Sequence, residues 1–113
     1  MPKSDLARLQ HVLEAASKAR DIATGKSRDD LDADEILRFA LIHLLELVGE
    51  AATGLSAEIR EREPQVPWAK TIALRNRLIH GYFDVDLDIV WDTIQGRLPS
   101  LIEAVEAVIA RHQ

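Results

Sequence analysis

Apolar residues recur every three or four positions along most of the chain, which is the spacing of one face of an α-helix. Four long segments show this pattern: residues 4–23, 34–53, 67–80, and a last one that starts after Asp84 or Asp86. No stretch alternates apolar and polar residues as a half-buried strand does. The pattern therefore predicts an all-α fold, a four- to five-helix up-and-down bundle.

Glycines, prolines and charged clusters mark the breaks between these helices. Gly25 ends the first one, and the charged residues 26–30 that follow are predicted to form a solvated loop. Residues 56–63 form a short charged segment that predicts one extra helix. Gly96 and Pro99 fall inside the last apolar stripe, so we expect that helix to kink or break there.

The helix over residues 34–53 is apolar on nearly every side. At 100° per residue, His43, Glu46 and Glu50 fall in one narrow polar arc of this surface. Asp32 or Asp34 is expected to cap its N-terminus. A helix of this kind lies in the centre of a bundle or in an oligomer interface.

Composition narrows the class of protein. The 113 residues predict one domain, residues 1–113, and a hydrophobic fraction of 47% is enough for a real core. The chain has no cysteine, no signal-peptide-like start and no long uncharged apolar run, so we expect a cytoplasmic protein with no membrane contact. The net charge of −5 argues against non-specific coating of nucleic acid but leaves room for a local basic cleft.

Residues 74–86 hold most of the polar groups capable of chemistry. On a helical wheel Arg75 lies at the border of the apolar arc, where a guanidinium needs an anionic partner or ligand. Glu50 and Glu46 are candidate partners, which gives a structural ion pair as one interpretation. An anionic ligand held by Arg75 is the other.

His80 can transfer a proton near neutral pH, or it can cap the helix C-terminus. Asn76 lies one turn before it and can orient it. An Arg and a His suffice for metal-free RNA cleavage, in which Arg75 stabilises charge on the phosphoryl group. The two are five residues apart, about 140° around an ideal helix, so a bent helix or a second copy across a twofold axis is needed.

Two further side-chain groups have open interpretations. Tyr82 can stack on a base, pack beside Phe83, or accept a modification. His43 with Glu46 and Glu50 resembles part of a carboxylate metal site, but such bundles use Glu-x-x-His twice and this order is reversed and single. We therefore expect neither a metal nor a cofactor.

Residues 75–82 read Arg-x4-His-x-Tyr, which resembles the HEPN superfamily and, within it, the HepT toxins of HepT–MntA toxin–antitoxin pairs. The likeness covers essentially the whole chain. The blocks that carry it are Leu47-Val48-Gly49-Glu50-Ala51-Ala52, Val66-Pro67-Trp68, Leu74-Arg75-Asn76-Arg77-Leu78-Ile79-His80, Tyr82-Phe83-x-Val85-Asp86 and Val90-Trp91.

The resemblance implies a dimerising helical bundle with metal-independent endoribonuclease activity on RNA. It implies that Arg75 and His80 line a composite cleft at the dimer interface, that Asn76 supports them, and that Glu50 partners Arg75. It also implies that Tyr82 is the residue AMPylated by an MntA-like nucleotidyltransferase antitoxin. Some HEPN-like domains instead serve as non-catalytic binding or adaptor subunits of a nucleotidyltransferase, and this remains the alternative.

Overall fold

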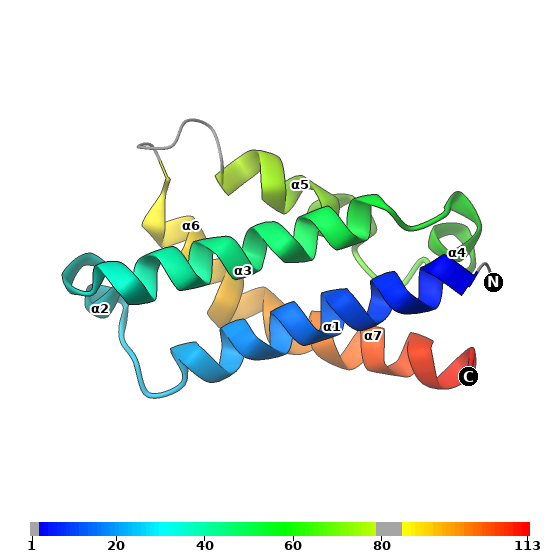
Figure 1. Cartoon of the computed structure of the whole chain (residues 1–113), viewed down its shortest axis with the longest axis horizontal. Coiled ribbons are helices and arrows are strands. Elements are labelled where there is room, and N and C mark those ends of the chain that lie inside the picture. The colour runs from blue at the N-terminus through cyan, green and yellow to red at the C-terminus, as the bar shows by residue number, and fades with distance from the viewer. Residues whose placement is uncertain (1–2, 79–84) are drawn as a thin grey trace.

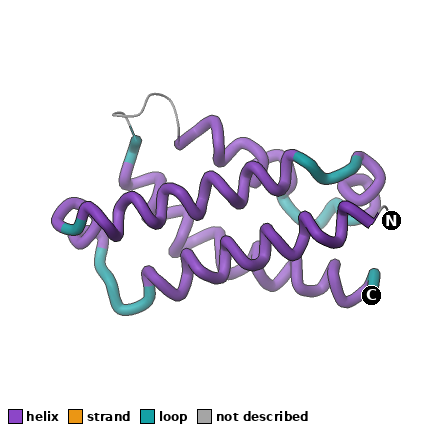
Figure 2. Tube along the Cα trace, in the orientation of Figure 1, coloured by secondary structure: helices purple, strands orange, loops and turns teal. Residues whose placement is uncertain are grey.

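The computed structural model describes residues 3–78 and 85–113, and this part of the chain consists of helices and their connections (Figure 2). The elements in chain order are α1 (Lys3–Ala23), α2 (Arg28–Ala33), α3 (Glu35–Thr53), α4 (Ala57–Arg62), α5 (Trp68–Leu78), α6 (Leu87–Asp92), the π-helical turn η1 (Thr93–Arg97) and α7 (Leu98–Arg111). None of these helices is long and apolar enough to cross a lipid bilayer.

The long helices run alternately up and down, which confirms the predicted bundle (Figure 1). Helix α1 packs against α3 and α7, and α5 packs against α3. The two ends of the chain lie at the same end of the bundle (Figure 1). Helix α3 is therefore covered by α1 on one side and by α5 on the other.

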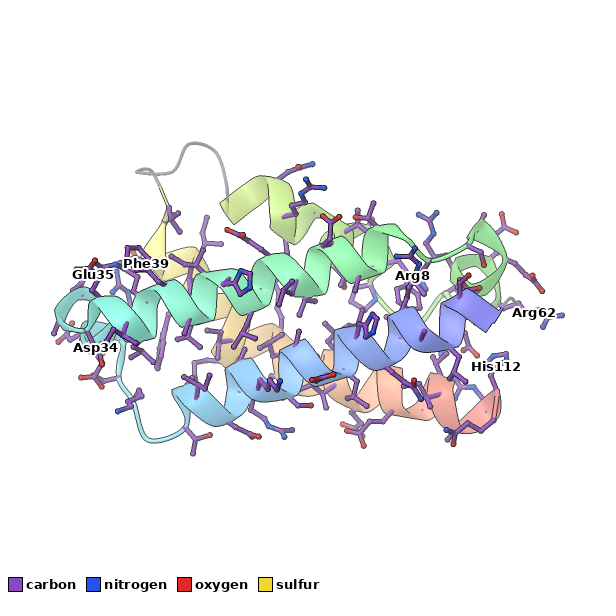
Figure 3. The ribbon with its side chains drawn as sticks, in the orientation of Figure 1. Arg8, Asp34, Glu35, Phe39, Arg62 and His112 are labelled. Carbon is purple, nitrogen blue, oxygen red and sulfur yellow. The ribbon has the colours of Figure 1, made fainter. Side chains whose placement is uncertain are left out.

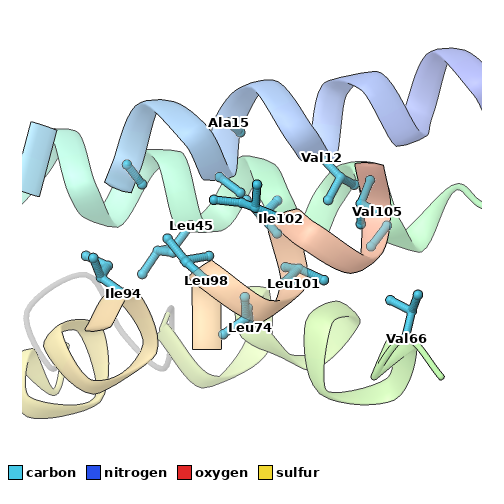
Figure 4. Packing of buried hydrophobic residues seen from close by; sticks show 14 of the residues in the cluster. Val12, Ala15, Leu45, Val66, Leu74, Ile94, Leu98, Leu101, Ile102 and Val105 are labelled. Carbon is cyan, nitrogen blue, oxygen red and sulfur yellow. The ribbon is translucent and has the colours of Figure 1, made fainter. Parts of the chain in front are cut away.

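Aliphatic side chains from all the long helices meet in one core (Figure 4). Leu9 and Val12 of α1, Leu45 of α3, and Leu98 and Val105 of α7 are completely buried. Full burial of one such side chain contributes about 1.5–3 kcal/mol. This core holds the helices in register and leaves α5 near the surface of the bundle.

Three polar side chains cap helices where the sequence suggests a start. Asp34, rather than Asp32, accepts a hydrogen bond from the Leu37 N–H at the start of α3. Ser56 caps α4, and Asp86 caps α6 by accepting from two backbone N–H groups. Such caps satisfy amide groups that have no partner inside the helix.

The predicted solvated loop at residues 26–30 is wrong. Helix α2 starts at Arg28, and the Ser27 N–H donates to the Asp30 carboxylate at 2.7 Å. Leu31 is completely buried and fixes the helix to the core. One apolar residue among charged ones creates no periodicity, so the pattern gave no sign of this helix.

The predicted break in the last helix is confirmed as a π-helical turn. The Leu98 N–H bonds to the carbonyl of Thr93, five residues back, and Pro99 lies in the first turn of α7. Proline lacks an N–H and is tolerated at a helix start. The extra residue of the π turn lets the chain restart as α7 and leaves Gly96 exposed to solvent.

Candidate functional site

Arg75 lies on α5 where this helix comes close to Gly49 of α3. A Cβ atom added at Gly49 of α3 would lie 2.9 Å from the Arg75 backbone nitrogen and 3.2 Å from its Cβ. Real side chains do not fit at such distances, so glycine permits this contact. The Gly49 contact therefore sets where the Arg75 side chain leaves the surface of the bundle.

The next residue on α3, Glu50, pairs with Arg75. Arg75 Nη1 lies 2.8 Å from Glu50 Oε2, and the two side chains are 52% and 59% exposed. Glu46, the other candidate partner, is half-buried and forms no ion pair within the described residues. A guanidinium has five N–H donors, so Arg75 can keep Glu50 and still donate to a phosphate.

An exposed stripe of α3 leads to this ion pair. Ile36, Phe39 and Leu47 are 83%, 57% and 41% exposed, and His43 between them is exposed as well. Phe39 projects outward near the α2 end of α3 (Figure 3). The spacing from Ile36 to Glu50 is that of one helical face. The apolar surface predicted for this helix is thus partly covered by the core and partly open.

The structure brings together only some of the residues that the sequence nominates. Arg75 and Asn76 are exposed neighbours in the last turns of α5, with Glu50 opposite Arg75. His80 and Tyr82 lie outside the described residues. The divergence of Arg75 and His80 around a single helix stays a prediction, as do the roles of both.

A second polar cluster, at the end of the bundle that holds both chain ends, escaped the sequence analysis (Figure 3). The Glu63 side chain accepts hydrogen bonds from Arg111 Nη2 and Gln65 Nε2, each at 2.5 Å, and lies 3.2 Å from His112 Nε2. Trp68 Nε1 donates to the Glu63 backbone carbonyl at 2.8 Å. The cluster ties the last turn of α7 to the connection between α4 and α5.

Glu63 is ionised over almost the whole accessible pH range. The hydrogen bond from Arg111, and then that from Gln65, lowers the pKa of Glu63 from 4.5 to about 2, although burial opposes this change. The same contact raises the pKa of Arg111. No sequence signal marked Glu63, because its partner Arg111 lies 48 residues away.

Within residues 3–78 and 85–113, no group of three or more His, Asp or Glu side chains is arranged to hold a metal ion. His43, Glu46 and Glu50 share a helix face but form no such group. The arrangement around Arg75 offers one guanidinium and one carboxylate. An exposed guanidinium of this kind is chemically able to bind an anion such as a phosphoryl group.

A family model described as "Ribonuclease HepT-like" matches residues 12–108. The chain belongs to the HepT-like family of ribonucleases. This confirms the family and the class of enzyme predicted from residues 75–82. No solved structure matches the HepT-like chain significantly.

Three relatives of this HepT-like chain illustrate the likeness. A "Putative RNase" of Caldanaerobacter subterraneus subsp. tengcongensis is 33% identical over 93% of this chain and 94% of the relative. A "Putative RNase" of Methanocaldococcus jannaschii is 34% identical over 96% of this chain and 91% of the relative. A "Probable ribonuclease HepT" of Thermococcus cleftensis is 31% identical over 89% and 92%. The similarity therefore extends over nearly the full length of this chain and of each relative.

Proposed function

We propose that this HepT-like protein is a metal-independent endoribonuclease toxin that acts in the cytoplasm as a homodimer. The observation that carries the proposal is the placement of Arg75. Its side chain is half exposed, paired with Glu50, and positioned by the Gly49 contact, in a chain of the HepT-like family. A guanidinium held in this way is available to a phosphate from solvent.

The proposed reaction assigns one role to each residue. His80 removes a proton from the attacking 2′-hydroxyl or gives one to the leaving oxygen, which breaks the phosphodiester bond. Arg75 stabilises the negative charge that develops on the phosphoryl oxygens. Asn76 orients the groups, and Glu50 holds Arg75 in place. These roles require no metal ion, because Arg75 supplies the positive charge.

The homodimer in this proposal completes the site. Arg75 and His80 diverge by about 140° on a straight helix, and of the two solutions, a bent helix or a second copy, the proposal takes the second copy, which supplies the facing group. The exposed apolar stripe of Ile36, Phe39 and Leu47 supports an interface on α3, and the same helix face ends at Glu50. An interface there would bring two copies of Arg75 to one cleft.

The proposal also includes an antitoxin, a minimal nucleotidyltransferase of the MntA type. The Tyr82 hydroxyl oxygen attacks the α-phosphorus of ATP, pyrophosphate leaves, and the phenolic proton passes to solvent. The added AMP brings bulk and a negative charge to the site, which repels RNA.

Cleavage of a labelled single-stranded RNA in the presence of EDTA tests the ribonuclease proposal. We expect the wild type to cut it and His80→Ala to be at least about a hundredfold slower. Equal cleavage by both would contradict the assignment of His80. A wild type that binds the nucleotidyltransferase but does not cut RNA would instead be a non-catalytic subunit.

Intact mass spectrometry after incubation with the nucleotidyltransferase and ATP tests the switch. We expect a mass increase equal to one AMP in the wild type and none in Tyr82→Phe. An increase that persists in Tyr82→Phe would place the modification on another residue. Cleavage measured on the modified sample then shows whether AMP silences the enzyme.

A further inference from the structure

Most of the arginine and lysine side chains in the described part of the chain already have a partner. Six of them pair with a carboxylate, and Arg38 and Arg60 donate to backbone carbonyls. The described cations without a hydrogen bond or an ion pair are Arg8, Lys26, Lys70 and Arg97. Because the net charge is −5, cations without a carboxylate partner are scarce.

Two of these four cations meet in one groove. Lys70 of α5 and Arg97 of η1 both line a groove of about 290 Å³ between α5 and the start of α7. Helix α5 packs closely on α3 but stands away from α7, which leaves this space open. No aspartate or glutamate is among its described lining residues. We call it the α5–α7 groove.

A second groove, between α1 and α3, shows why the charge of the α5–α7 groove matters. It has a volume of about 330 Å³ and includes Arg8 and Lys18, but also Glu14 and Glu50. Lys18 pairs with Glu14 at 3.0 Å. The charges of the α1–α3 groove therefore cancel, while those of the α5–α7 groove add.

The polar groups of the α5–α7 groove favour binding of a negatively charged phosphate over hydrogen bonding to the edge of a base. Thr71 Oγ1 donates to the Pro67 carbonyl at 2.8 Å, and Ser100 Oγ donates to the Arg97 carbonyl at 3.1 Å. Both hydroxyl hydrogens are therefore engaged within the protein. Lys70 and Arg97 remain as donors, and cations of this kind read the phosphate backbone rather than the sequence.

The groove lies next to the Arg75 site. Leu74 forms part of its wall, and Arg75 is the next residue of α5. Lys70 and Arg75 are about 7.5 Å apart along the helix axis, at 1.5 Å per residue. Single-strand binding sites extend over roughly 4–16 nucleotides. A strand that meets Arg75 on one flank of α5 is thus long enough to reach Lys70 on the other.

We infer that the α5–α7 groove binds the phosphate backbone of the RNA strand on one side of the cleaved bond, with Lys70 and Arg97 as its contacts. This inference rests on the proposed ribonuclease function. It extends the site from Arg75 to a region that contains no catalytic group. It also explains how a chain with net charge −5 holds RNA, since the positive charge is local.

The salt dependence of RNA binding tests the inference. The probe is a fluorescein-labelled 2′-O-methyl RNA of about 12 nucleotides, which lacks the attacking hydroxyl. Each phosphate contact contributes about 0.7 to the slope of log K against log salt. The Lys70→Gln/Arg97→Gln double variant should lower this slope by about 1.4. A fourfold rise in salt should then cost the wild type about sevenfold more affinity than the variant.

Arg20→Gln/Lys26→Gln is the matched control, because it removes the same charge from exposed residues that do not line the groove. Its slope should stay at the wild-type value. Lys70→Arg/Arg97→Lys keeps both charges and should bind like the wild type, which separates charge from folding. A slope change shared by the control, or a double variant with an altered oligomeric state, would overturn the inference.

Cleavage of unmodified RNA, measured in parallel, separates the inference from the proposed function. If the wild type cuts RNA but the double variant keeps the wild-type slope, the groove assignment fails and the ribonuclease proposal stands. If the wild type binds the probe through the groove but does not cut RNA, the groove stands and the ribonuclease proposal fails.

Discussion

Among the residues that the structure describes, two Arg–Glu pairs join distant parts of the sequence, and they differ in their exposure to water. Glu50 and Arg75 are both more than half exposed, whereas the Glu63 side chain is only 8% exposed beside Arg111. A buried carboxylate that loses its partner is costly, so Glu63 has to keep its hydrogen bonds. An exposed pair contributes little stability and can share its arginine with a ligand. The comparison gives the Glu63–Arg111 pair a structural role and is consistent with the functional role proposed for the Glu50–Arg75 pair.

The largest effect that this comparison predicts is on catalysis. Arg75→Ala should slow RNA cleavage by about 10²- to 10³-fold, because it removes the group proposed to stabilise charge on the phosphoryl oxygens. Its Tm should change by no more than about 4 °C, since the pair with Glu50 is exposed. Initial cleavage rates and thermal melts followed by circular dichroism check both parts.

Arg62→Ala is the control for this substitution. Arg62 is 60% exposed and lies 3.9 Å from Glu58, so it also belongs to an exposed pair. The control should leave both the rate and Tm near the wild-type values. If Arg75→Ala lowered Tm by much more than about 4 °C, the loss of activity would be explained by unfolding. Arg75 would then be a structural residue, and the contrast between the two pairs would fail.

The buried pair gives an intermediate effect, and it falls on stability. Glu63→Gln should lower Tm at neutral pH by about 5–10 °C, because it weakens charge-assisted hydrogen bonds from Arg111. The folded-state pKa of Glu63, about 2, lies below its ordinary value of 4.5. The stability from its ionised form is therefore complete above about pH 4.5 and is lost as the pH falls towards 2.

Thermal melts between pH 2 and 7 follow this dependence. The difference in Tm between the wild type and Glu63→Gln should be largest above pH 4.5 and should shrink at lower pH. Glu61→Gln, which changes an exposed carboxylate nearby, should show no such convergence. A difference that stayed constant down to pH 2 would mean that the charge of Glu63 does not stabilise the fold.

The fold was predictable where it depends on repetition. The long helices, the cap at Ser56 and the break near Gly96 follow from local patterns, and the caps at Asp34 and Asp86 are each one of two candidates that the sequence offered. Helix α2 was not predicted, because a single buried leucine, Leu31, fixes it to the core. Local spacing thus predicts elements that repeat an apolar face, and it misses elements fixed by a single tertiary contact.

The site was predictable in its residue types and in the pairing of Arg75 with Glu50, but not in the packing that produces this pair. The wheel placed Arg75 at a boundary and proposed Glu50 and Glu46 as partners, but the Gly49 contact is what brings Arg75 to Glu50. The sequence did not predict a role for Glu63, because neither its burial nor its contact with Arg111 leaves a pattern in the neighbouring residues. Close approach and burial depend on how helices pack, which a single sequence does not display.

The smallest predicted effect tests whether Glu50 belongs to the functional side of the comparison. Glu50→Gln keeps an acceptor for Arg75 but removes a negative charge beside the proposed phosphate site. Binding of the 2′-O-methyl RNA probe should become about twofold to fivefold tighter, the size expected for one exposed charge pair. The cause is the loss of competition between a carboxylate and a phosphate for one guanidinium. Tm should stay within about 4 °C of the wild-type value.

Glu58→Gln serves as the reference for this last substitution, since Glu58 is also about half exposed and faces an arginine. It removes the same net charge away from Arg75, so it should leave RNA binding unchanged if the effect of Glu50→Gln is local. Weaker binding by Glu50→Gln would show that the ionised carboxylate positions Arg75 for RNA. Tighter binding in Glu50→Gln that persists when Arg75 is also replaced by alanine would show that the carboxylate repels RNA directly. The double variant thus distinguishes competition for the guanidinium from simple repulsion of the strand.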